Sequence, residues 1–348
     1  MKRIFLIIVV CGGFMLGLKA QDSSSTLHHI EGVDIVGKKP SVDHIPILPE
    51  AKSKNLGDLL AENTGGYIKK NGIASLSSLN IGGIGGQRAV LDWQGVNLQS
   101  KMNSYADLWM LPSFLFNQVG IGLNSSNIPL NGGLGGGIKL GNFSHTDEIL
   151  LSLGSFSNKQ IGLGINLLDH KKLKSSIKIY HAKGKNDFEF TSFTNKTKKQ
   201  SHAEAEQTHF VWQNSYSWNE KNNISLSYWG LKSKRNLPPT LFEAISGASQ
   251  KDRNHRLALT FTHKGKGEEK WNSYALKSHF IDEYIGFKDD IKKSKGENFA
   301  QSLYAQYQHG FHWHNYVNDV TTSVFFQTQG SLHHIKTLSY GQDEKKEN

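Results

Sequence analysis

The sequence predicts a mainly β protein: a small α+β domain followed by antiparallel strands of a transmembrane β-barrel that is incomplete in this chain. Three observations indicate this class. Residues 55–145 are dense in glycine and short apolar runs, residues 146–348 alternate polar and apolar side chains, and the N-terminus carries an export signal. Alternation with a period of two, interrupted by turn residues, is typical of antiparallel strands.

The composition excludes several other classes of protein. The chain of 348 residues has 35 glycines, 7 prolines and a formal net charge of +10. Its apolar content is near that of globular proteins, which excludes wholesale disorder. The single cysteine, Cys11, excludes a disulfide scaffold, and the single long apolar run excludes a bundle of membrane helices.

Residues 1–20 form the predicted signal peptide. Two basic residues precede an apolar run from Ile4 to Leu18, and Ala20 offers a small residue for cleavage. The alternative is a membrane anchor, but glycines interrupt the run and it is shorter than the ~20 residues that span a bilayer. Cleavage after Ala20 removes three of the ten excess positive charges and leaves a mature chain without cysteine.

Residues 146–348 are expected to supply about ten strands of the barrel wall. Between Asn223 and Trp229, the side chains of Ile224, Leu226 and Tyr228 share one face, and small or polar residues share the other. A soluble sandwich shows the same alternation. The export signal, long polar connections at 193–207 and 233–256, and tryptophans near the expected strand ends favour a membrane barrel. These tryptophans are Trp212, Trp218, Trp229, Trp271 and Trp313.

Residues 55–145 contain short elements in a definite order. Asn55 is the expected N-cap of a short amphipathic helix with Asp58 in its first turn, ended by Gly65 and Gly66. A strand at 67–70 and a turn follow, and then come glycine-rich apolar segments as far as residue 140.

In this order, the segments resemble the plug domain of TonB-dependent outer-membrane receptors, which take up siderophores, haem, vitamin B12 and other scarce solutes. The chain departs from the family pattern at Gly82, where the family usually has arginine, and at Gln94, where it has Asp or Asn. The residues that carry the resemblance are Gly65, Gly66, Gly82, Gly83, Gln94, Gly95, Asn97, Asp107, Pro112, Gly132, Gly135 and Gly136.

The glycines also have a physical reason that is independent of the resemblance. Glycine permits positive φ and close approach of two backbones, which strands enclosed by a barrel wall require. Residues 135–140 are expected to form the joint where the plug becomes the first strand of the wall. A phosphate-binding loop is excluded because neither 82–86 nor 132–137 has the Gly-x-Gly-x-x-Gly spacing, and no Gly-Lys-Ser/Thr occurs.

A short extended segment follows the signal peptide and contains Val33, Asp34, Ile35 and Val36. Its position and its pattern of acidic and apolar residues resemble the Ton box, the strand by which these receptors pair with a periplasmic energy-transducing protein of the TonB type. The first strand of the plug itself is the alternative interpretation. Residues 21–54 are thus expected to be an N-terminal extension with a candidate Ton box, and 55–145 to be the plug.

Other side-chain clusters indicate no catalytic chemistry, and we expect neither an enzyme nor a cofactor. No Ser/His/Asp or paired-carboxylate arrangement stands out, and basic clusters such as 232–235 lack a nucleic-acid-binding signature. These clusters are expected to face lipopolysaccharide or an anionic chelate, or to be solvated turns.

Three histidine pairs lack carboxylate or cysteine partners at ligand spacing, so surface histidines are favoured over a metal site. They are His28/His29, His312/His314 and His333/His334.

The length limits the size of the barrel. Transporters with a plugged lumen use about 22 strands, whereas the residues after 145 suffice for roughly ten. We therefore expect a truncated, split or incomplete receptor that exposes an unpaired edge strand.

The expected function is energy-coupled uptake of a scarce solute, such as an iron-siderophore, haem or cobalamin, by a receptor in the cell outer membrane. The alternative is a secreted or surface β-protein that only binds, as an adhesin does.

Overall fold

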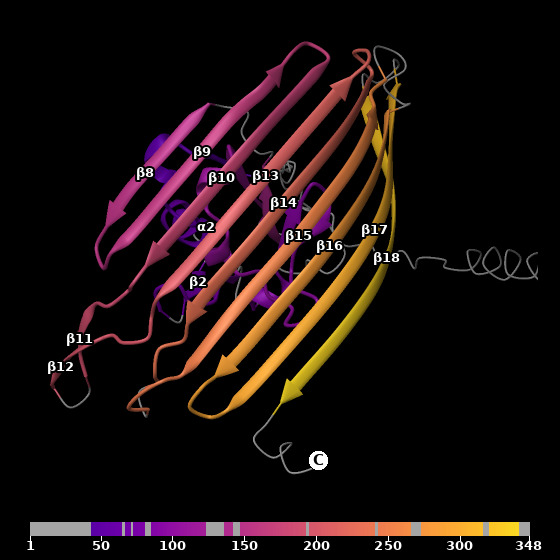
Figure 1. Cartoon of the computed structure of the whole chain (residues 1–348). Coiled ribbons are helices and arrows are strands. Elements are labelled where there is room, and N and C mark those ends of the chain that lie inside the picture. Colours follow the sequence, from indigo (N-terminus) through magenta and orange to yellow (C-terminus); the bar gives the residue numbers. More distant parts are fainter. Residues whose placement is uncertain are drawn as a thin grey trace, which may run out of the picture. The chain divides into compact units, whose positions relative to one another are not determined.

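The computed structural model of the chain shows a mainly β fold. It describes residues 43–64, 67–70, 72–80, 85–122, 136–141, 147–192, 195–240, 243–265, 273–315 and 320–340. We call residues 43–141 the small domain; the strands that follow it form one large antiparallel sheet (Figure 1). No helix within these described ranges is long and apolar enough to cross a membrane.

The helix predicted near Asn55 is present as α2 (Leu56–Asn63). The Asn55 side chain accepts a hydrogen bond of 2.9 Å from the Asp58 backbone N–H, which confirms the predicted N-cap. Leu56, Leu59 and Leu60 are buried, so the apolar face of α2 forms part of the core. Gly65 and Gly66, predicted to end the helix, lie outside the described residues.

The small domain contains two small sheets and several 3₁₀ helices. One sheet is a hairpin, and the other has five strands in the order β1-β6-β7-β4-β5, in which only β4 and β7 run parallel. The hairpin is β2 (Tyr67–Lys70) with β3 (Ser77–Asn80), and the five strands are β1 (Asp43–Pro46), β4 (Val90–Trp93), β5 (Val96–Asn97), β6 (Gln118–Gly122) and β7 (Gly137–Leu140). The 3₁₀ helices are η1 (Pro49–Ala51), η2 (Gly86–Arg88), η3 (Leu108–Met110) and η4 (Ser113–Leu115).

The expectation that 135–140 forms the joint between plug and wall is wrong, because β7 belongs to the five-stranded sheet of the small domain. β7 pairs with β4 on one side and with β6 on the other. Ile138 and Leu140 are both buried in the core of this domain. Burying these two side chains favours pairing within the small domain, and the large sheet begins only at Glu148.

The large sheet is an antiparallel meander of nine strands in the order β18-β17-β16-β15-β14-β13-β10-β9-β8 (Figure 1). A separate hairpin, β11 (Glu189–Thr191) with β12 (Thr197–Lys199), lies in the connection between β10 and β13. The nine strands are β8 (Glu148–Gly154), β9 (Asn158–Asp169), β10 (Leu173–Gly184), β13 (Ala205–Ser217), β14 (Asn222–Asn236), β15 (Ala248–His263), β16 (Ser273–Asp289), β17 (Ser294–Asn315) and β18 (Val320–Tyr340).

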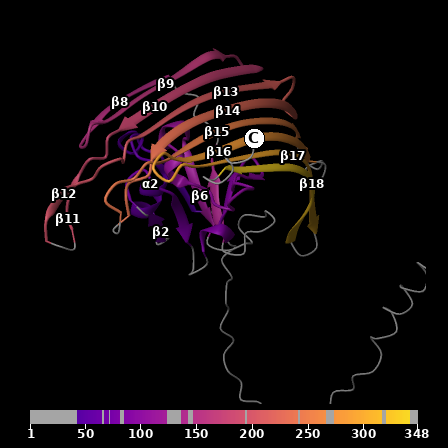
Figure 2. The ribbon, with the colours of Figure 1, turned by 60° about the horizontal axis from the view of Figure 1, so that its bottom comes forward.

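The two faces of the nine-stranded sheet are inverted relative to a soluble sandwich. The convex face exposes large apolar side chains, such as Leu151 at 74% and Leu153 at 84% relative exposure. The concave face curves over the small domain (Figure 2) and buries polar side chains. The buried polar side chains of the sheet include Gln207, His209, Gln213, Arg235, Asp252, Asn254, Arg256 and Gln306. Apolar outward and polar inward is the pattern of a membrane barrel wall.

Among the tryptophans predicted to lie near strand ends, Trp229 is a correction. It is fully buried in the middle of β14, with its ring centroid 5.7 Å from that of Trp93 in the small domain. The odd-numbered residues of β14 face inward, so this tryptophan packs on the small domain instead of facing outward. Trp212 also lies in the middle of its strand, β13, and not near an end, although it is partly exposed, as is Trp218. Trp271 and the side chain of Trp313 lie outside what the structure describes.

The two longest connections between neighbouring strands of the nine-stranded sheet lie at the same end, which we call the long-connection end. They are residues 185–204 and 237–247. The connection predicted at 233–256 is therefore shorter than expected, because β14 continues to Asn236 and β15 begins at Ala248. The turns 170–172 and 218–221 lie at the opposite end.

Candidate functional site

The contact between the small domain and the sheet contains three of the six described plug-motif residues, Gln94, Gly95 and Asp107. The β4–β5 turn is one part of it. Gln94 and Gly95 both have positive φ (54° and 97°), as the tight turn of a two-residue hairpin requires. The Asp92 side chain accepts a hydrogen bond of 2.7 Å from the Gly95 N–H, and Gln94 Nε2 donates to Ser227 Oγ of β14 at 3.2 Å. The tip of this hairpin therefore touches the wall.

Gly95 is required both by its conformation and by its surroundings. A Cβ at this position would lie 2.8 Å from Gln306 Oε1 and 2.9 Å from Lys277 Nζ, two side chains of the sheet. Burial raises the pKa of the nearby Asp92 carboxyl, against the opposing effects of the Gly95 N–H and of Lys139 and Lys277.

Asn97 has a structural position inside the small domain. Its Oδ1 accepts from the backbone N–H of Leu91 at 3.3 Å and of Gln99 at 3.0 Å, while its Nδ2 donates to Gln99 Oε1 at 2.7 Å. These bonds hold the strand that leaves the β4–β5 turn.

Asp107 anchors the second part of the contact. It is buried, caps η3 by accepting from the Trp109 N–H at 3.1 Å, and accepts from the Ser77 N–H at 3.1 Å. Its Oδ2 forms an ion pair of 2.7 Å with Arg235 Nη1 of β14. Burial raises the pKa of the Asp107 carboxyl, although Arg235 opposes this shift.

Arg235 of β14 belongs to this contact and was not predicted from the sequence. Its guanidinium also donates to the Ala74 carbonyl oxygen at 3.4 Å and lies 5.5 Å from the centre of the Trp109 ring. The alternation of side chains along β14 could have predicted its inward position, because Arg235 falls on the same face of the strand as Trp229 and Leu231.

Lys178 makes a similar inward contact from β10. Its buried ammonium donates to the Phe114 carbonyl oxygen at 2.9 Å and pairs with Glu148. Two cations of the sheet, Lys178 and Arg235, thus bind backbone carbonyls of the small domain, at positions that alternation places on the inner face.

Pro112 and Gly136 support the small domain internally. Pro112 forms a bridge with Asn55, next to a hydrogen bond of 2.7 Å from the Leu56 N–H to the Leu111 carbonyl oxygen. Gly136 has φ of 81°, and its carbonyl oxygen accepts from the Val90 N–H at 3.1 Å.

The remaining predicted site residues lie outside the described residues. They are the candidate Ton box residues Val33, Asp34, Ile35 and Val36 and the plug-motif glycines Gly65, Gly66, Gly82, Gly83, Gly132 and Gly135.

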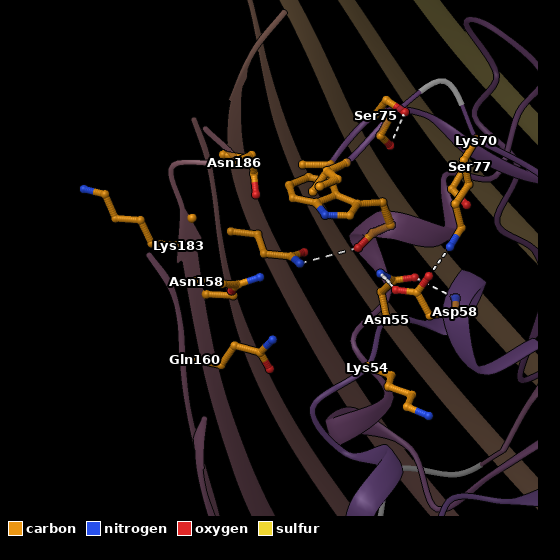
Figure 3. Close-up of a pocket in the computed structure, with 18 of the residues that line it drawn as sticks. Lys54, Asn55, Asp58, Lys70, Ser75, Ser77, Asn158, Gln160, Lys183 and Asn186 are labelled. Atoms are coloured by element: carbon orange, nitrogen blue, oxygen red, sulfur yellow. Dashed lines mark hydrogen bonds and ion pairs between the residues drawn. The ribbon is translucent and has the colours of Figure 1, made fainter. Parts of the chain in front are cut away.

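A cavity of about 560 Å³ lies between the small domain and the sheet, near the long-connection end. The small domain contributes the start of α2 and the segment between β2 and β3, while the sheet contributes β9, β10 and β13. Figure 3 shows side chains of both parts around this space. The lining includes the amides Asn55, Asn158, Gln160, Asn186 and Gln207, the charged residues Lys54, Asp58, Lys70 and Lys183, and the aromatic residues Trp109, Tyr180 and Phe188.

The polar groups of this cavity are largely held in place. Lys54 pairs with Glu62, Lys70 pairs with Asp58, and Gln207 Nε2 donates to the Trp109 carbonyl oxygen at 3.4 Å. Gln160 Oε1 is buried without a hydrogen-bond partner among the described residues. An unsatisfied buried acceptor beside amides and an indole suits a polar ligand that brings its own donors.

The histidine pairs form no metal site in the part of the chain that the structure describes, where no group of three or more His, Cys, Asp or Glu side chains could hold an ion. His333 Nδ1 lies 2.8 Å from Ser302 Oγ, as expected of a histidine in an ordinary hydrogen bond. His28, His29 and the side chains of His312 and His314 lie outside the described part.

Solved outer-membrane receptors and transporters share this fold. The copper transporter OprC is similar over 87% of this chain and 49% of its own, with a TM-score of 0.67 and 11% identity. The Serratia marcescens haemophore receptor HasR, a double mutant solved with its haemophore HasA and haem, matches over 87% and 46%, with a TM-score of 0.68 and 14% identity. The alcaligin outer-membrane receptor FauA of Bordetella pertussis matches over 88% and 49%, with a TM-score of 0.65 and 11% identity.

No protein-family model and no curated protein sequence matches the chain. The structural similarity nevertheless confirms the predicted fold: this chain has the fold of TonB-dependent outer-membrane receptors, with a small plug domain and antiparallel strands of the barrel wall. It spans about half the length of the solved receptors that it matches.

Proposed function

We propose that this chain forms the plug and part of the wall of an outer-membrane receptor that takes up a scarce solute, driven by a periplasmic TonB-type protein. The observation that carries the proposal is the inversion of the nine-stranded sheet. Its outward face exposes residues such as Leu151 and Leu153, whereas its inward face buries Arg235 and Asp252 over a small domain. Such a sheet is stable only where lipid covers the outward face.

The connections give the orientation. Membrane barrels have short periplasmic turns and longer extracellular loops. The long-connection end, with 185–204 and 237–247, is therefore assigned to the cell exterior, and the turns 170–172 and 218–221 to the periplasm. With this assignment, the cavity of about 560 Å³ lies toward the cell exterior, because its lining includes Gly184 and Asn186 beside the connection 185–204.

The cavity is the proposed ligand site because both halves of the fold line it. A ligand that contacts Gln160 of the wall and the β2–β3 segment of the plug would link the two. Amides, lysines and the Trp109 indole suit a polar organic solute or chelate. An iron-siderophore, haem or cobalamin is the class that the resemblance proposes. The candidate Ton box at 33–36 would pair with the periplasmic protein and transmit the force that this protein exerts.

Deletion of residues 30–37 tests the transport function. In cells that express the chain from its own locus, energy-dependent accumulation of labelled iron-siderophores, haem and cobalamin is measured with and without the deletion. Uptake of one of them should fall to the level of de-energised cells. Deletion of the eight residues 22–29 is the matched control and should leave uptake intact.

The same experiment separates the alternative function. A surface protein that only binds would retain its binding to cells or to a solute after removal of 30–37, and no accumulation would depend on energy. Unchanged energy-dependent uptake in the 30–37 deletion would contradict the proposed coupling.

A further inference from the structure

Four cationic side chains form one cluster on the outward face of the sheet, near the long-connection end. Lys232 and Lys234 belong to β14, and Lys251 and Arg253 belong to β15, and all four are exposed. The strand register places Lys232 opposite Arg253 and Lys234 opposite Lys251. We call these residues the cation quartet; β14 and β15 are neighbours in Figure 1.

Two like-charged pairs directly opposite each other on adjacent strands are unfavourable. The neighbouring strands show how the protein offsets such a pair elsewhere. Lys288 stands opposite Lys295, but each has its own carboxylate, with Lys288 Nζ 2.5 Å from Asp290 and Lys295 Nζ 3.0 Å from Glu297.

The cation quartet has no such compensation among the described residues, where none of the four forms a salt bridge. The acid closest in register is Glu206, opposite Lys234, and its carboxylate pairs with Lys183 at 3.8 Å. The quartet therefore presents four positive charges that an external anion would stabilise.

The quartet also lies at a definite level of the sheet, directly beyond the exposed apolar band. Along β15, Arg253 is followed on the same outward face by His255, Leu257 and Leu259. Leu257 and Leu259 are more than two fifths exposed, as is Phe280, which stands opposite Leu257 on β16.

Two tyrosines mark the boundary between this band and the cations. Tyr228 leans over Gly230, where a Cβ would lie 3.0 Å from the phenolic oxygen, and Tyr284 leans over Gly286 in the same way. Both hydroxyl groups thus point toward the long-connection end. The Arg253 guanidinium lies 5.4 Å from the centre of the Tyr284 ring. Tyrosines with an apolar body and a polar tip are typical of the membrane interface.

We propose that Lys232, Lys234, Lys251 and Arg253 bind the phosphate groups of an anionic glycolipid in the outer leaflet of the membrane. This inference rests on the membrane location and orientation proposed above. A lipid is favoured over a soluble anion because its acyl chains can cover the apolar band around Leu257 and Phe280 while its phosphates contact the quartet. Juxtamembrane lysines and arginines attract anionic headgroups in this way.

Binding of lipid A to the purified full chain in detergent tests the proposal. The probes are diphosphorylated lipid A and its dephosphorylated form, and the readout is the dissociation constant at fixed salt. The site variant Lys232→Gln/Lys234→Gln/Lys251→Gln/Arg253→Gln should bind diphosphorylated lipid A at least about 10-fold more weakly. The dephosphorylated lipid should bind wild type and variant equally.

The matched control removes the same number of charges at the opposite end. Lys171, Lys172, Lys221 and Lys264 surround a separate cavity at the turns there, and their replacement by glutamine should leave lipid binding within about 2-fold of wild type. The charge-retaining variant Lys232→Arg/Lys234→Arg/Lys251→Arg should bind as wild type does, which separates loss of charge from loss of folding.

Three results would overturn the proposal: equal binding by wild type and the site variant, equal losses in the site and control variants, or binding of inorganic pyrophosphate as tight as that of lipid A. The last result would indicate a soluble anion. Deletion of 30–37 should not change lipid binding, so failure of the uptake proposal is distinguishable from failure of this one.

Discussion

Asp107 of the small domain and Arg235 of β14 form a buried ion pair, with 2.7 Å between Oδ2 and Nη1, although 128 residues separate them in the chain. Both side chains are only 4% exposed. At position 82, where the receptor family usually has an arginine, this chain has a glycine. In this ion pair between the two halves of the fold, the cation belongs to the wall and the acid to the small domain.

Breaking this pair on one side should destabilise the chain. Arg235→Met leaves Asp107 buried without its cation, so the free energy of unfolding should fall by about 3–5 kcal/mol. The double variant Asp107→Leu/Arg235→Met should lose less. Urea unfolding followed by tryptophan fluorescence measures the free energy of unfolding of both variants. The control is Asp169→Asn, which breaks the exposed Lys174–Asp169 pair and should change the free energy of unfolding little. A double variant no more stable than Arg235→Met would contradict a strong buried pair.

Gly137 should tolerate no side chain. A Cβ there would overlap the backbone of Val90, the partner of Gly137 in the parallel β4–β7 pairing. We expect Gly137→Ala to lower the free energy of unfolding by roughly 1–3 kcal/mol through overpacking. Gly85→Ala is the matched control, since a Cβ at Gly85 meets open space and its φ is −58°. Equal stability of the two variants would exclude this close approach.

The buried Asp92 should make stability depend on pH. Burial raises the folded-state pKa of the Asp92 carboxyl above the usual value of an aspartate. The folded state therefore holds the proton more tightly than the unfolded state, and the resulting stability is present below the unfolded pKa and is lost as pH rises through the folded pKa. Asp92→Asn cannot ionise, so its stability relative to wild type should rise as pH increases from about 4.

Unfolding midpoints of Asp92→Asn and wild type, measured across this pH window, check that sign. A difference that is constant with pH, or that falls as pH rises, would show that Asp92 titrates normally or with a lowered pKa.

Single cysteines should report the orientation of the sheet. The only cysteine of the chain is Cys11, within the predicted signal peptide. Lys196→Cys, exposed in the β11–β12 hairpin, should react with a membrane-impermeant maleimide on intact cells. Lys171→Cys, exposed at the opposite end, should react only after the outer membrane is permeabilised. The reverse labelling pattern would invert the proposed orientation, and with it the lipid leaflet that the cation quartet faces.

Much of the local structure could be predicted from the residues alone. Asn55 and Asp58 specify the start of α2 through capping chemistry, and the strand predicted at 67–70 is present as β2. The alternation around Ile224 and Leu226 correctly predicted one apolar face and one small or polar face in the first half of β14. These features depend on neighbours within a few residues, which is why sequence patterns report them.

The residue pattern was sufficient to predict the class of fold: a glycine-rich small domain and a meander of alternating strands. The folded chain was needed to show that Trp229 faces inward on Trp93, that residues 137–140 pair with β4 within the small domain, and that Arg235 meets Asp107. The physical reason is that a period of two defines two faces of a strand but not which face meets another domain. Pairings and ion pairs between distant residues are selected by burial and packing when the two halves of the chain come together.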